Sequence, residues 1–431
     1  MKSLKNLPHS KMILLCVVIA ILSVFLFYVI LNIVFWCNGM PECFFEYEIL
    51  ENDTIEISFY NGPFVLMNIP DTINGKPVTS IGDSIFEKTS FRDDKVSGHR
   101  HNMIKNALLA VRLPDTVEEI HFAAFKDCKS LGTINIPANL RFVGWRILSG
   151  TKVSKLVFPE GITEIGCGDD VDLGDRQCVE AFADMKYLCE IEFPKSLKKI
   201  GNNAFADCTN LKKTELPDEI EEIKYGAFQN SGLEEVNTPK SLTKNSGCVF
   251  KGTPFEKSLE TAAKSDFIIF NDVLLYKYIG DDENVVIPDG IECICDRAFW
   301  NAPNIRTVDI PESVKYINYA FELSSVENLV IPDTVDPDSC MSFYGCRGLK
   351  NIVLSDRMTE IQNHAFEKCV SLESIIIPES VTYIGDYAFC ECSSLKEVTI
   401  EGTPQMGDNV FESCNAIVYK AHDKKDAGFA A

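Results

Sequence analysis

Residues 377–400 read IPESVTYIGDYAFCECSSLKEVTI, and variants of this stretch recur along most of the chain. Residues 113–137 read LPDTVEEIHFAAFKDCKSLGTINIP, and residues 193–217 read FPKSLKKIGNNAFADCTNLKKTELP. The shared form is IPxxVxxIGxxAFxxCxxLxxIxIP, with a period of about 23 residues. Such repeats are units that bury their apolar side only against their neighbours. The pattern therefore predicts one solenoid and not the separate globular domains that a length of 431 residues would otherwise suggest.

The C-terminal end of each repeat, Leu-x-x-Ile-x-Ile, alternates apolar and polar residues. This alternation is typical of a short strand with one buried face. In the copy quoted first, Leu395, Val398 and Ile400 are expected to point into the core, and Thr399 is expected to face solvent. The recurring phenylalanine, Phe389 in this copy, is expected to fill the core. A second apolar pair in each repeat predicts a second short strand, so each coil has two.

One repeat position is often glycine. Gly82, Gly144, Gly166, Gly201 and Gly385 share it. Because glycine adopts positive φ without steric cost, these residues are expected to supply a bend with unusual φ.

Composition and charge narrow the class of protein. Apolar residues make up 46% of the chain and charged residues 24%, so the chain can bury a large core and is not disordered in general. Lys and Arg number 41 against 63 Asp and Glu, a formal net charge of −22. Such a charge repels phosphate backbones, so nucleic acid is not expected as a partner.

The N-terminal segment predicts a membrane anchor. Residues 12–36 contain no charged side chain, and as a helix they would be about 37 Å long, which exceeds a hydrocarbon core of about 30 Å. The alternative is a cleaved secretory signal, but signal cores span roughly 7 to 15 residues and end at small residues. This run ends at Phe35, Trp36 and Cys37. We therefore expect an uncleaved anchor.

The orientation of the anchor follows from its flanking charges. Lys2, Lys5 and Lys11 precede it with no acidic residue among them. Basic residues beside a membrane span favour the cytoplasmic side. We expect a single-pass plasma-membrane protein with a cytoplasmic N-terminus and an extracellular C-terminal ectodomain.

A helix and a hairpin interrupt the repeats. Thr253, Pro254 and Glu256 form a capping box with proline at the first helical position, which predicts a helix over 254–264. The runs FIIF and VLLYKY then flank Asn271 and Asp272, which indicates a β-hairpin. We interpret the insertion as a structural break between two arrays, with a docking site as the alternative.

These observations give the expected organisation. It consists of a cytoplasmic tail at 1–11, the anchor at 12–36, a juxtamembrane segment and capping hairpin at 37–68, a first array at 69–253 with loops 88–106 and 167–178, the insertion at 254–286, a second array at 287–420, and a tail at 421–431.

The quoted motifs resemble the BspA-type leucine-rich repeat surface proteins. The resemblance extends over about residues 45–420, including a leading hairpin and first coil. It implies a mainly β, α+β leucine-rich repeat solenoid behind one transmembrane helix. It also implies an extracellular adhesive or ligand-binding role, with host matrix or cell-surface partners in some members, and no enzymatic activity. For this chain we expect a protein or glycan ligand on a host or neighbouring cell.

Two loops contain residue types that can bind metals. His99 and His101 lie in the first loop, but no third ligand has a recognisable spacing. The second loop, CGDDVDLGDRQC at 167–178, is rich in aspartate but lacks the glycine and glutamate positions of an EF-hand. Solvated loops are the favoured interpretation, weak calcium binding by the second loop is the alternative, and no cofactor is expected.

The chain contains 17 cysteines. Six of them lie three residues after a repeat phenylalanine, where other coils have Ser, Thr or Ala, so that position is expected to need a small buried side chain and not a thiol. Cys37 with Cys43, and Cys167 with Cys178, are the candidate disulfides because each pair closes a loop.

Function is expected to depend on binding. No GxSxG, HExxH or GxxxxGK[ST] motif occurs. We expect an adhesin or a protein- or glycan-binding scaffold, with a cell-envelope spacer as the alternative and a surface hydrolase acting through an insertion loop as the second alternative. The candidate binding residues are the outward strand positions: Lys212, Lys213, Glu215, Glu234, Glu235, Asn237, Arg306, Thr307, Asp309, Glu327, Asn328, Lys350, Asn351, Glu373, Ser374, Lys396 and Glu397.

Overall fold

The computed structural model describes residues 9–86, 103–166, 180–242, 244–245, 247–300, 302–337, 339, 341–414 and 416–420. The chain divides into two compact units. The first comprises Met1–Pro194 and Asp207–Leu211, and the second comprises Lys195–Ala206 and Lys212–Ala431. The division into arrays at residues 254–286 stays a prediction.

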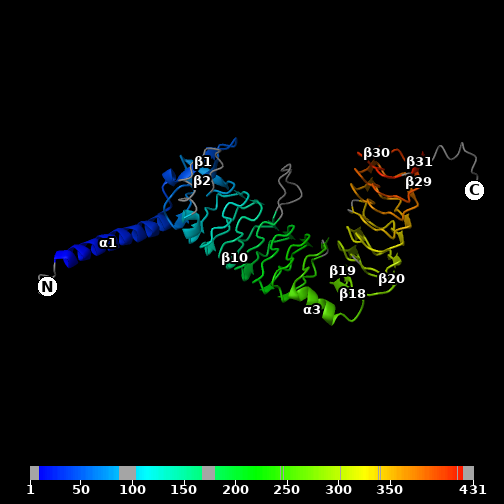
Figure 1. Cartoon of the computed structure of the whole chain (residues 1–431), viewed down its shortest axis with the longest axis horizontal. Helices are drawn as coiled ribbons and strands as arrows, with labels where there is room; N and C mark the ends of the chain where they lie inside the picture. Colours follow the sequence, from blue (N-terminus) through cyan, green and yellow to red (C-terminus); the bar gives the residue numbers. More distant parts are fainter. Residues whose placement is uncertain are drawn as a thin grey trace, which may run out of the picture. The chain divides into compact units, whose positions relative to one another are not determined.

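The first unit begins with a long helix and continues as stacked coils (Figure 1). Its helices are α1 (His9–Asn38) and the short 3-10 helix η2 (Glu42–Phe44). Its strands are β1 (Phe45–Ile49), β2 (Ile55–Tyr60), β3 (Leu66–Asn68), β4 (Thr72–Ile73), β5 (Lys76–Ile81), β6 (Ala110–Arg112), β7 (Glu119–Ile120), β8 (Thr133–Ile134), β9 (Phe142–Val143), β10 (Lys155–Val157), β11 (Glu164–Ile165) and β12 (Glu190–Glu192).

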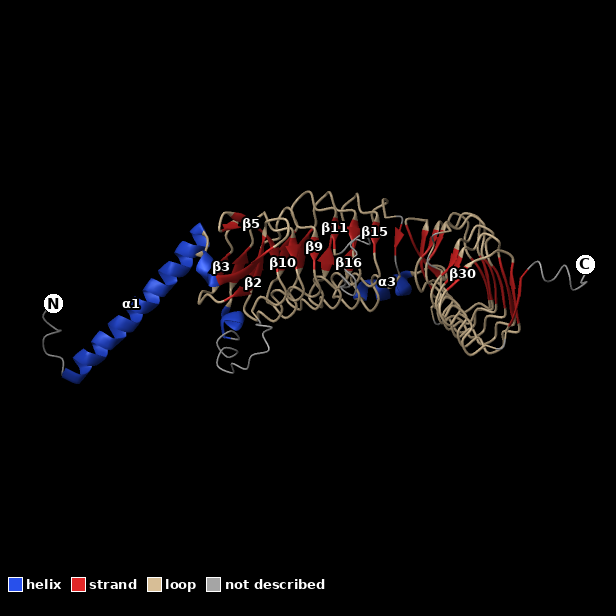
Figure 2. Cartoon of the chain, turned by 90° about the horizontal axis from the view of Figure 1, so that it is seen from above, coloured by secondary structure: helices blue, strands red, loops and turns tan. Residues whose placement is uncertain are grey.

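The coils of the first unit follow the predicted two-strand plan. β1 and β2 form the expected leading antiparallel hairpin, and β2, β5, β7 and β9 then pair in parallel as one sheet. A second sheet is formed by β3, β6 and β8, also in parallel. Each coil therefore adds one strand to each sheet, and Figure 2 shows the strands of neighbouring coils side by side with loops closing the coils.

The second unit has the same construction. Its helix is α3 (Pro254–Ala262). Its strands are β13 (Lys199–Ile200), β14 (Lys213–Thr214), β15 (Glu222–Ile223), β16 (Glu235–Val236), β17 (Lys244–Asn245), β18 (Phe267–Phe270), β19 (Leu274–Tyr278), β20 (Asn284–Val286), β21 (Cys293–Ile294), β22 (Thr307–Asp309), β23 (Tyr316–Ile317), β24 (Asn328–Val330), β25 (Asn351–Val353), β26 (Glu360–Ile361), β27 (Ser374–Ile377), β28 (Tyr383–Ile384), β29 (Glu397–Ile400), β30 (Gln405–Met406) and β31 (Ile417–Lys420).

Stacked phenylalanines fill the core of the second unit, as predicted from their spacing. The rings of Phe299 and Phe321 are 5.0 Å apart and 3° from parallel, and those of Phe366 and Phe389 are 5.1 Å apart and also 3° from parallel. Phe343 lies between Phe321 and Phe366, at 6.2 and 5.1 Å. Because each ring comes from a different coil, removing one opens a gap between two neighbouring coils.

The cysteines three residues after the repeat phenylalanines are small, and three of them also form hydrogen bonds to the preceding coil. The thiols of Cys346, Cys369 and Cys392 donate to the carbonyl oxygens of Phe321, Phe343 and Phe366, at 2.9, 3.1 and 3.0 Å. The small buried side chain expected at this position is present, and in these three coils its S–H also reaches a carbonyl of the preceding coil.

Burial also makes these thiols unreactive. It raises the pKa of Cys208 to about 12 and that of Cys346 to about 11. Since the thiolate is the reactive form, neither residue is a nucleophile near neutral pH.

Glycine occupies this repeat position for a different reason from the predicted one. Of the five glycines, only Gly166 has a positive φ, at 103°. A Cβ on Gly385 would lie 2.4 Å from the backbone nitrogen of Asn363, and one on Gly144 would lie 2.7 Å from backbone atoms of His121 and Phe122. Close contact with the preceding coil therefore excludes a side chain at these two positions.

The predicted helix and hairpin are confirmed, and both are built into the stack. Thr253 caps α3 by accepting from the backbone nitrogen of Glu256, with Pro254 at the helix start. β18 and β19 pair antiparallel, and β19 also pairs in parallel with β21 of the next coil. The side-chain amide of Asn271 donates to the carbonyl of Pro239 at 2.7 Å. The hairpin thus connects the coil before it to the coil after it.

A buried carboxyl beside this hairpin predicts a pH dependence. Asp296 is 8% exposed, and burial raises its pKa from 3.8 to about 6. Folding therefore takes up a proton between about pH 4 and 6, so the contribution of this group to stability falls as pH rises through that range and stays low above it. Asp296→Asn removes the charge, and we expect it to raise the free energy of unfolding at pH 7.5 by about 1 to 3 kcal/mol.

Urea titrations of the two proteins at pH 4.5 and 7.5 test this prediction. The difference between them should shrink at pH 4.5, where Asp296 is protonated in the folded chain. A difference of equal size at both pH values would show that the carboxyl is charged throughout.

Candidate binding face

The outward side chains of the coils in the second unit form three parallel columns. We define the outer strand face as the exposed side of β20, β22, β24, β25, β27 and β29, with the residue that precedes each strand. Parallel pairing in register sets equivalent residues opposite each other, as for Asn328 with Asn351. Neighbouring strands lie about 4.8 Å apart, so each column is a ladder of like positions.

The first column is charged, and its charges pair with each other along the stack. Lys350 contacts Glu327 at 2.8 Å, and Lys396 contacts Glu373 at 3.1 Å. Arg306 contacts Glu283 at 3.4 Å. The earlier coils show the same arrangement, with Lys212 at 3.1 Å from Glu234 and Lys213 at 3.6 Å from Glu235. These exposed pairs contribute little to stability, but they neutralise the face.

The second column consists mostly of short polar side chains, and four of them pair across coils. The amide nitrogen of Asn351 donates to the amide oxygen of Asn328 at 2.7 Å, and the hydroxyl of Thr307 donates to Asn284 at 2.7 Å. Ser374 is exposed and Glu397 is half-buried in the same column.

Asn237 is held by the fold. Its side-chain amide accepts from the backbone nitrogen of Leu216 at 2.7 Å and donates to the carbonyl of Leu216 at 2.8 Å. The side chain thus makes the same pair of hydrogen bonds to Leu216 that the backbone of a neighbouring strand residue would make. Of the predicted binding residues at the third column, Glu215 and Asp309 are exposed.

The third column contains apolar residues that were not among the predicted binding residues. Val330, Val353 and Ile376 are each 58% exposed, and we call them the apolar row. They occupy one repeat position, 23 residues apart. Val286 occupies this position in the first coil of the face and is also exposed. Successive residues of a strand point to opposite faces, so with Ile375 and Ile377 inward the middle isoleucine, Ile376, has to point outward, and the sequence could have revealed it.

Thr399 departs from the expected exposure at this position. It was predicted to face solvent, but it is buried. Thr399 lies directly opposite Tyr419 of β31 in the parallel pair β29 and β31. A large aromatic side chain on the neighbouring strand accounts for the loss of exposure, so the prediction for Thr399 is wrong.

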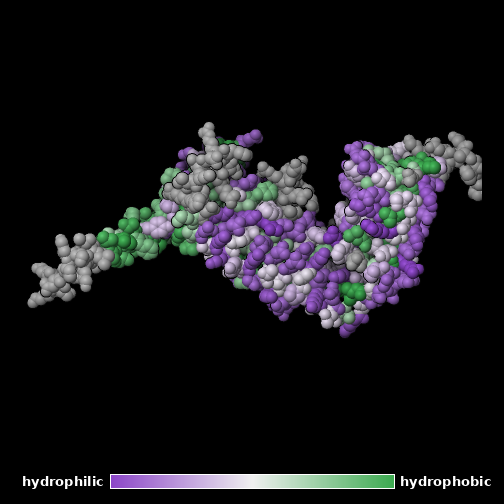
Figure 3. All heavy atoms as spheres, viewed as in Figure 1, coloured by the Kyte–Doolittle hydropathy of each residue, from purple (hydrophilic) through white to green (hydrophobic). Residues whose placement is uncertain are grey.

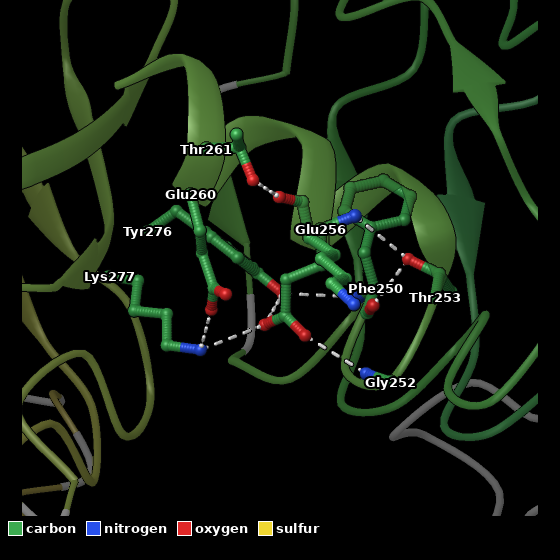
Figure 4. A network of polar contacts seen from close by, with 9 residues as sticks. Phe250, Gly252, Thr253, Glu256, Glu260, Thr261, Tyr276 and Lys277 are labelled. Carbon is green, nitrogen blue, oxygen red and sulfur yellow. Dashed lines mark hydrogen bonds and ion pairs between the residues drawn. The ribbon is translucent and has the colours of Figure 1, made fainter. Parts of the chain in front are cut away.

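The polar cluster around α3 is a structural one (Figure 4). One carboxylate oxygen of Glu256 accepts from the backbone nitrogen of Gly252 at 2.9 Å. The other lies 3.3 Å from both the Tyr276 hydroxyl and the Lys277 ammonium. Lys277 also contacts Glu260 at 2.6 Å. Every charge in the cluster therefore has a partner within it.

Two groups of this cluster have a pKa raised by their surroundings. Burial raises the pKa of the Tyr276 hydroxyl well above its usual value. Burial opposes the charge on Lys277, but Glu260 and Glu256 outweigh it and raise the pKa of that ammonium. Neither group is poised to transfer a proton.

The other predicted sites are not brought together by the described residues. No group of three or more His, Cys, Asp or Glu side chains suited to a metal occurs within the parts of the chain that the structure describes. His99, His101 and the aspartate-rich loop with Cys167 and Cys178 lie outside those parts. Cys37 and Cys43 are free, exposed thiols, so their disulfide is not formed in this structure and stays a prediction.

A polar hollow of about 550 Å³ lies beside the end of α1 in the first unit. Its lining includes Cys37, Asp71, Arg112, Asp115 and Asn135. A lining with one arginine and two aspartates gives no clear preference for either an anion or a cation, so the outer strand face remains the better candidate.

The N-terminal helix matches the predicted membrane span in length and composition. The segment Cys16–Asn38 has a mean hydropathy of 2.9 over its most apolar window. Its apolar surface contrasts with the hydrophilic surface of the coils (Figure 3). A helix of this kind near the N-terminus is compatible with a membrane span or a signal sequence.

The chain belongs to the BspA type leucine rich repeat family. The family model matches in six copies at residues 103–168, 178–266, 275–336 and 318–424. The predicted resemblance and the predicted solenoid fold are thereby confirmed. The family consists of repeat scaffolds, and with the apolar helix it suggests a secreted or membrane-anchored protein.

Several solved structures are similar to the chain. A leucine-rich repeat protein from Bacteroides ovatus is 21% identical, covers 88% of this chain and 93% of its own, and gives a TM-score of 0.36. A leucine rich cell surface protein from Faecalibacterium prausnitzii is 21% identical, with coverages of 89% and 94% and a TM-score of 0.37. The pneumococcal vaccine antigen PcpA is 17% identical, with coverages of 88% and 87% and a TM-score of 0.36. No curated protein matches the sequence.

Proposed function

We propose that the protein is a membrane-anchored, non-catalytic scaffold that displays its coils outside the cell and binds a protein partner through the apolar row. One observation carries the proposal. Val330, Val353 and Ile376 are each 58% exposed in one row, beside columns in which Lys350 pairs with Glu327, Lys396 pairs with Glu373 and Asn351 pairs with Asn328. Exposed apolar side chains rimmed by polar ones are typical of protein interaction sites.

The chemistry of the row favours a protein over a glycan. A partner with aliphatic side chains would bury the row by the hydrophobic effect, at about 25 cal/mol per Å² of apolar surface. Sugars are bound mainly through hydrogen bonds, and Asn328, Asn351 and Thr307 each spend one of theirs on a neighbouring coil of the face. The paired charges likewise favour a partner patch without a strong net charge, such as an apolar patch on a host or neighbouring-cell protein.

A binding comparison tests the proposed function. The full chain in lipid nanodiscs would be presented to immobilised matrix and cell-surface proteins and to a glycan array, as wild type and as Val353→Asp with Ile376→Asp. We expect the wild type to bind at least one protein and the double variant to bind it at least tenfold more weakly, because two charges would have to be desolvated.

Val157→Asp provides the matched control. Val157 is 47% exposed at the equivalent outward position of β10, in the first unit. The same chemical change there should leave binding within about twofold. Binding that is unaffected by the double variant, or that is seen only on glycans, would reject the apolar row as the binding site. A wild type that binds nothing would favour the spacer.

A further inference from the structure

The last three turns of α1 are packed against the first coil of the solenoid. Figure 2 shows α1 ending beside β3. The ring of Phe35 lies 5.0 Å from that of Phe64 and 6.3 Å from that of Phe44, both edge-on. Tyr28 stacks on Phe64 at 5.9 Å and donates its hydroxyl hydrogen to the carbonyl of Pro63 at 2.9 Å. These contacts join the helix to the coil on its aromatic side.

A polar residue within the apolar helix completes the contact. Asn32 is 4% exposed. Its side-chain oxygen accepts from the backbone nitrogens of Val65 at 3.1 Å and Leu66 at 3.4 Å, and its amide nitrogen donates to the carbonyl of Tyr28 at 2.9 Å. The amide nitrogen of Asn68 returns a bond to the carbonyl of Trp36 at 2.8 Å.

These bonds satisfy the free edge of a sheet. β3 is the first strand of the sheet β3, β6 and β8, so one of its edges has no neighbouring strand. Leu66 N–H points to Asn32, and the carbonyl of Asn68 accepts from the backbone nitrogen of Met40 at 3.0 Å. An uncovered edge strand pairs readily with other chains, and covering it is the usual protection.

We propose that residues 28–38 of α1 are the N-terminal cap of the solenoid, and that they hold the first coil directly against the outer surface of the bilayer that α1 crosses. This inference rests on the membrane anchoring proposed above. It makes α1 a permanent part of the folded ectodomain, because its removal as a cleaved signal would leave Val65, Leu66 and Asn68 without their partners.

The length of the helix supports this placement. The undocked part that carries no charge, residues 12–27, is about 24 Å long as a helix, so a hydrocarbon core of about 30 Å also reaches the first docked turns. On the docked part, Ile30, Ile33 and Val34 remain 47%, 53% and 41% exposed on the side away from the coil. Lipid at the interface would cover them while the opposite side of the same turns holds the cap.

The first test measures the cap in the full chain in nanodiscs. Asn32→Leu removes the acceptor but keeps the helix apolar, and Asn38→Leu makes the same change where the amide bonds only to Val34 of the helix itself. We expect hydrogen exchange at the Val65 and Leu66 amides to accelerate at least tenfold in Asn32→Leu and less than twofold in Asn38→Leu. Equal exchange in the two variants would overturn the cap.

The second test measures depth and does not need Asn32 to be changed. Trp36 would be the only tryptophan in a chain with Trp145→Phe and Trp300→Phe. We expect lipids brominated near the headgroup to quench its fluorescence more strongly than lipids brominated near the bilayer centre. Stronger quenching from the centre, or none from either lipid, would overturn the placement of the first coil at the surface.

Flotation with liposomes separates this inference from the proposed function. A chain that floats but shows equal exchange in the two asparagine variants loses the cap and keeps its anchor. A chain that does not float loses the anchoring itself.

Discussion

Phe366→Ala is expected to destabilise the coils around it by about 3 to 5 kcal/mol, the usual cost of truncating a buried phenylalanine. Phe366 is 2% exposed, and its ring is stacked between those of Phe343 and Phe389 at 5.1 Å on each side. The substitution removes both stacking contacts and leaves a cavity between three coils. Because each coil is stabilised mainly by its neighbours, the substitution should also lower the stability of the adjacent coils.

Hydrogen exchange measures this loss locally. The amide of Phe343 donates to the carbonyl of Ala365, and the amide at position 366 donates to that of Ala388 at 2.7 Å. Exchange at both should accelerate by roughly a hundredfold or more, since 1.36 kcal/mol corresponds to tenfold. Ile376→Ala, at an exposed position of the same coil, is the control and should change exchange less than about threefold. Similar effects of the two substitutions would contradict a core built on the phenylalanine stack.

Glu256→Ala is expected to have the second largest effect, about 3 kcal/mol or more. Glu256 is 8% exposed, and truncation would leave the Gly252 N–H and the Tyr276 hydroxyl without their acceptor and Lys277 without one of its two carboxylates. Removing one member of a buried charged pair typically costs 3 to 5 kcal/mol, because the remaining groups stay desolvated.

Glu260→Ala is the matched control for that change. Its side chain also contacts Lys277, but it is 38% exposed. We expect it to cost less than about 1 kcal/mol. Limited proteolysis over residues 254–278 would compare the two variants. Faster cleavage in Glu256→Ala alone supports the cluster as a structural support, and equal cleavage would contradict it.

The coils were predictable because each depends on a pattern that is local in the sequence. The phenylalanine and Leu-x-x-Ile-x-Ile spacings are repeated, and identical coils stack with like residues in contact, so the ring stack follows from the repeat alone. The cap of α3 involves Thr253, Pro254 and Glu256, which are adjacent in the chain, and its signature is equally readable.

Features that depend on contact between coils were not predictable in the same way. Gly385 is required by the backbone of Asn363 in the preceding coil, and Cys369 donates to a carbonyl 26 residues earlier. Asn237 appeared to be a free surface amide, and only the position of Leu216 shows that the fold uses it. None of these contacts leaves a local signal in the sequence.

The sequence predicted which strand positions point outward, but not which of their side chains remain available for binding. The outward strand positions were identified correctly from alternation, and polar residues were selected among them. The structure pairs many of those residues with each other, and it exposes Val330, Val353 and Ile376, which were not among them. Similarly, the sequence shows Asn32 as one polar residue in an apolar run, whereas the structure shows its buried amide linking helix and coil.

Labelling of intact cells that express the full chain tests most directly whether the solenoid acts outside the membrane. A membrane-impermeant amine reagent followed by mass spectrometry would compare Lys212, Lys350 and Lys396, whose side chains are 58%, 53% and 75% exposed, with Lys2, Lys5 and Lys11 before the helix. The account predicts modification of the first three and none of the last three until the cells are opened. Modification of the N-terminal lysines with protection of those on the coils would contradict it.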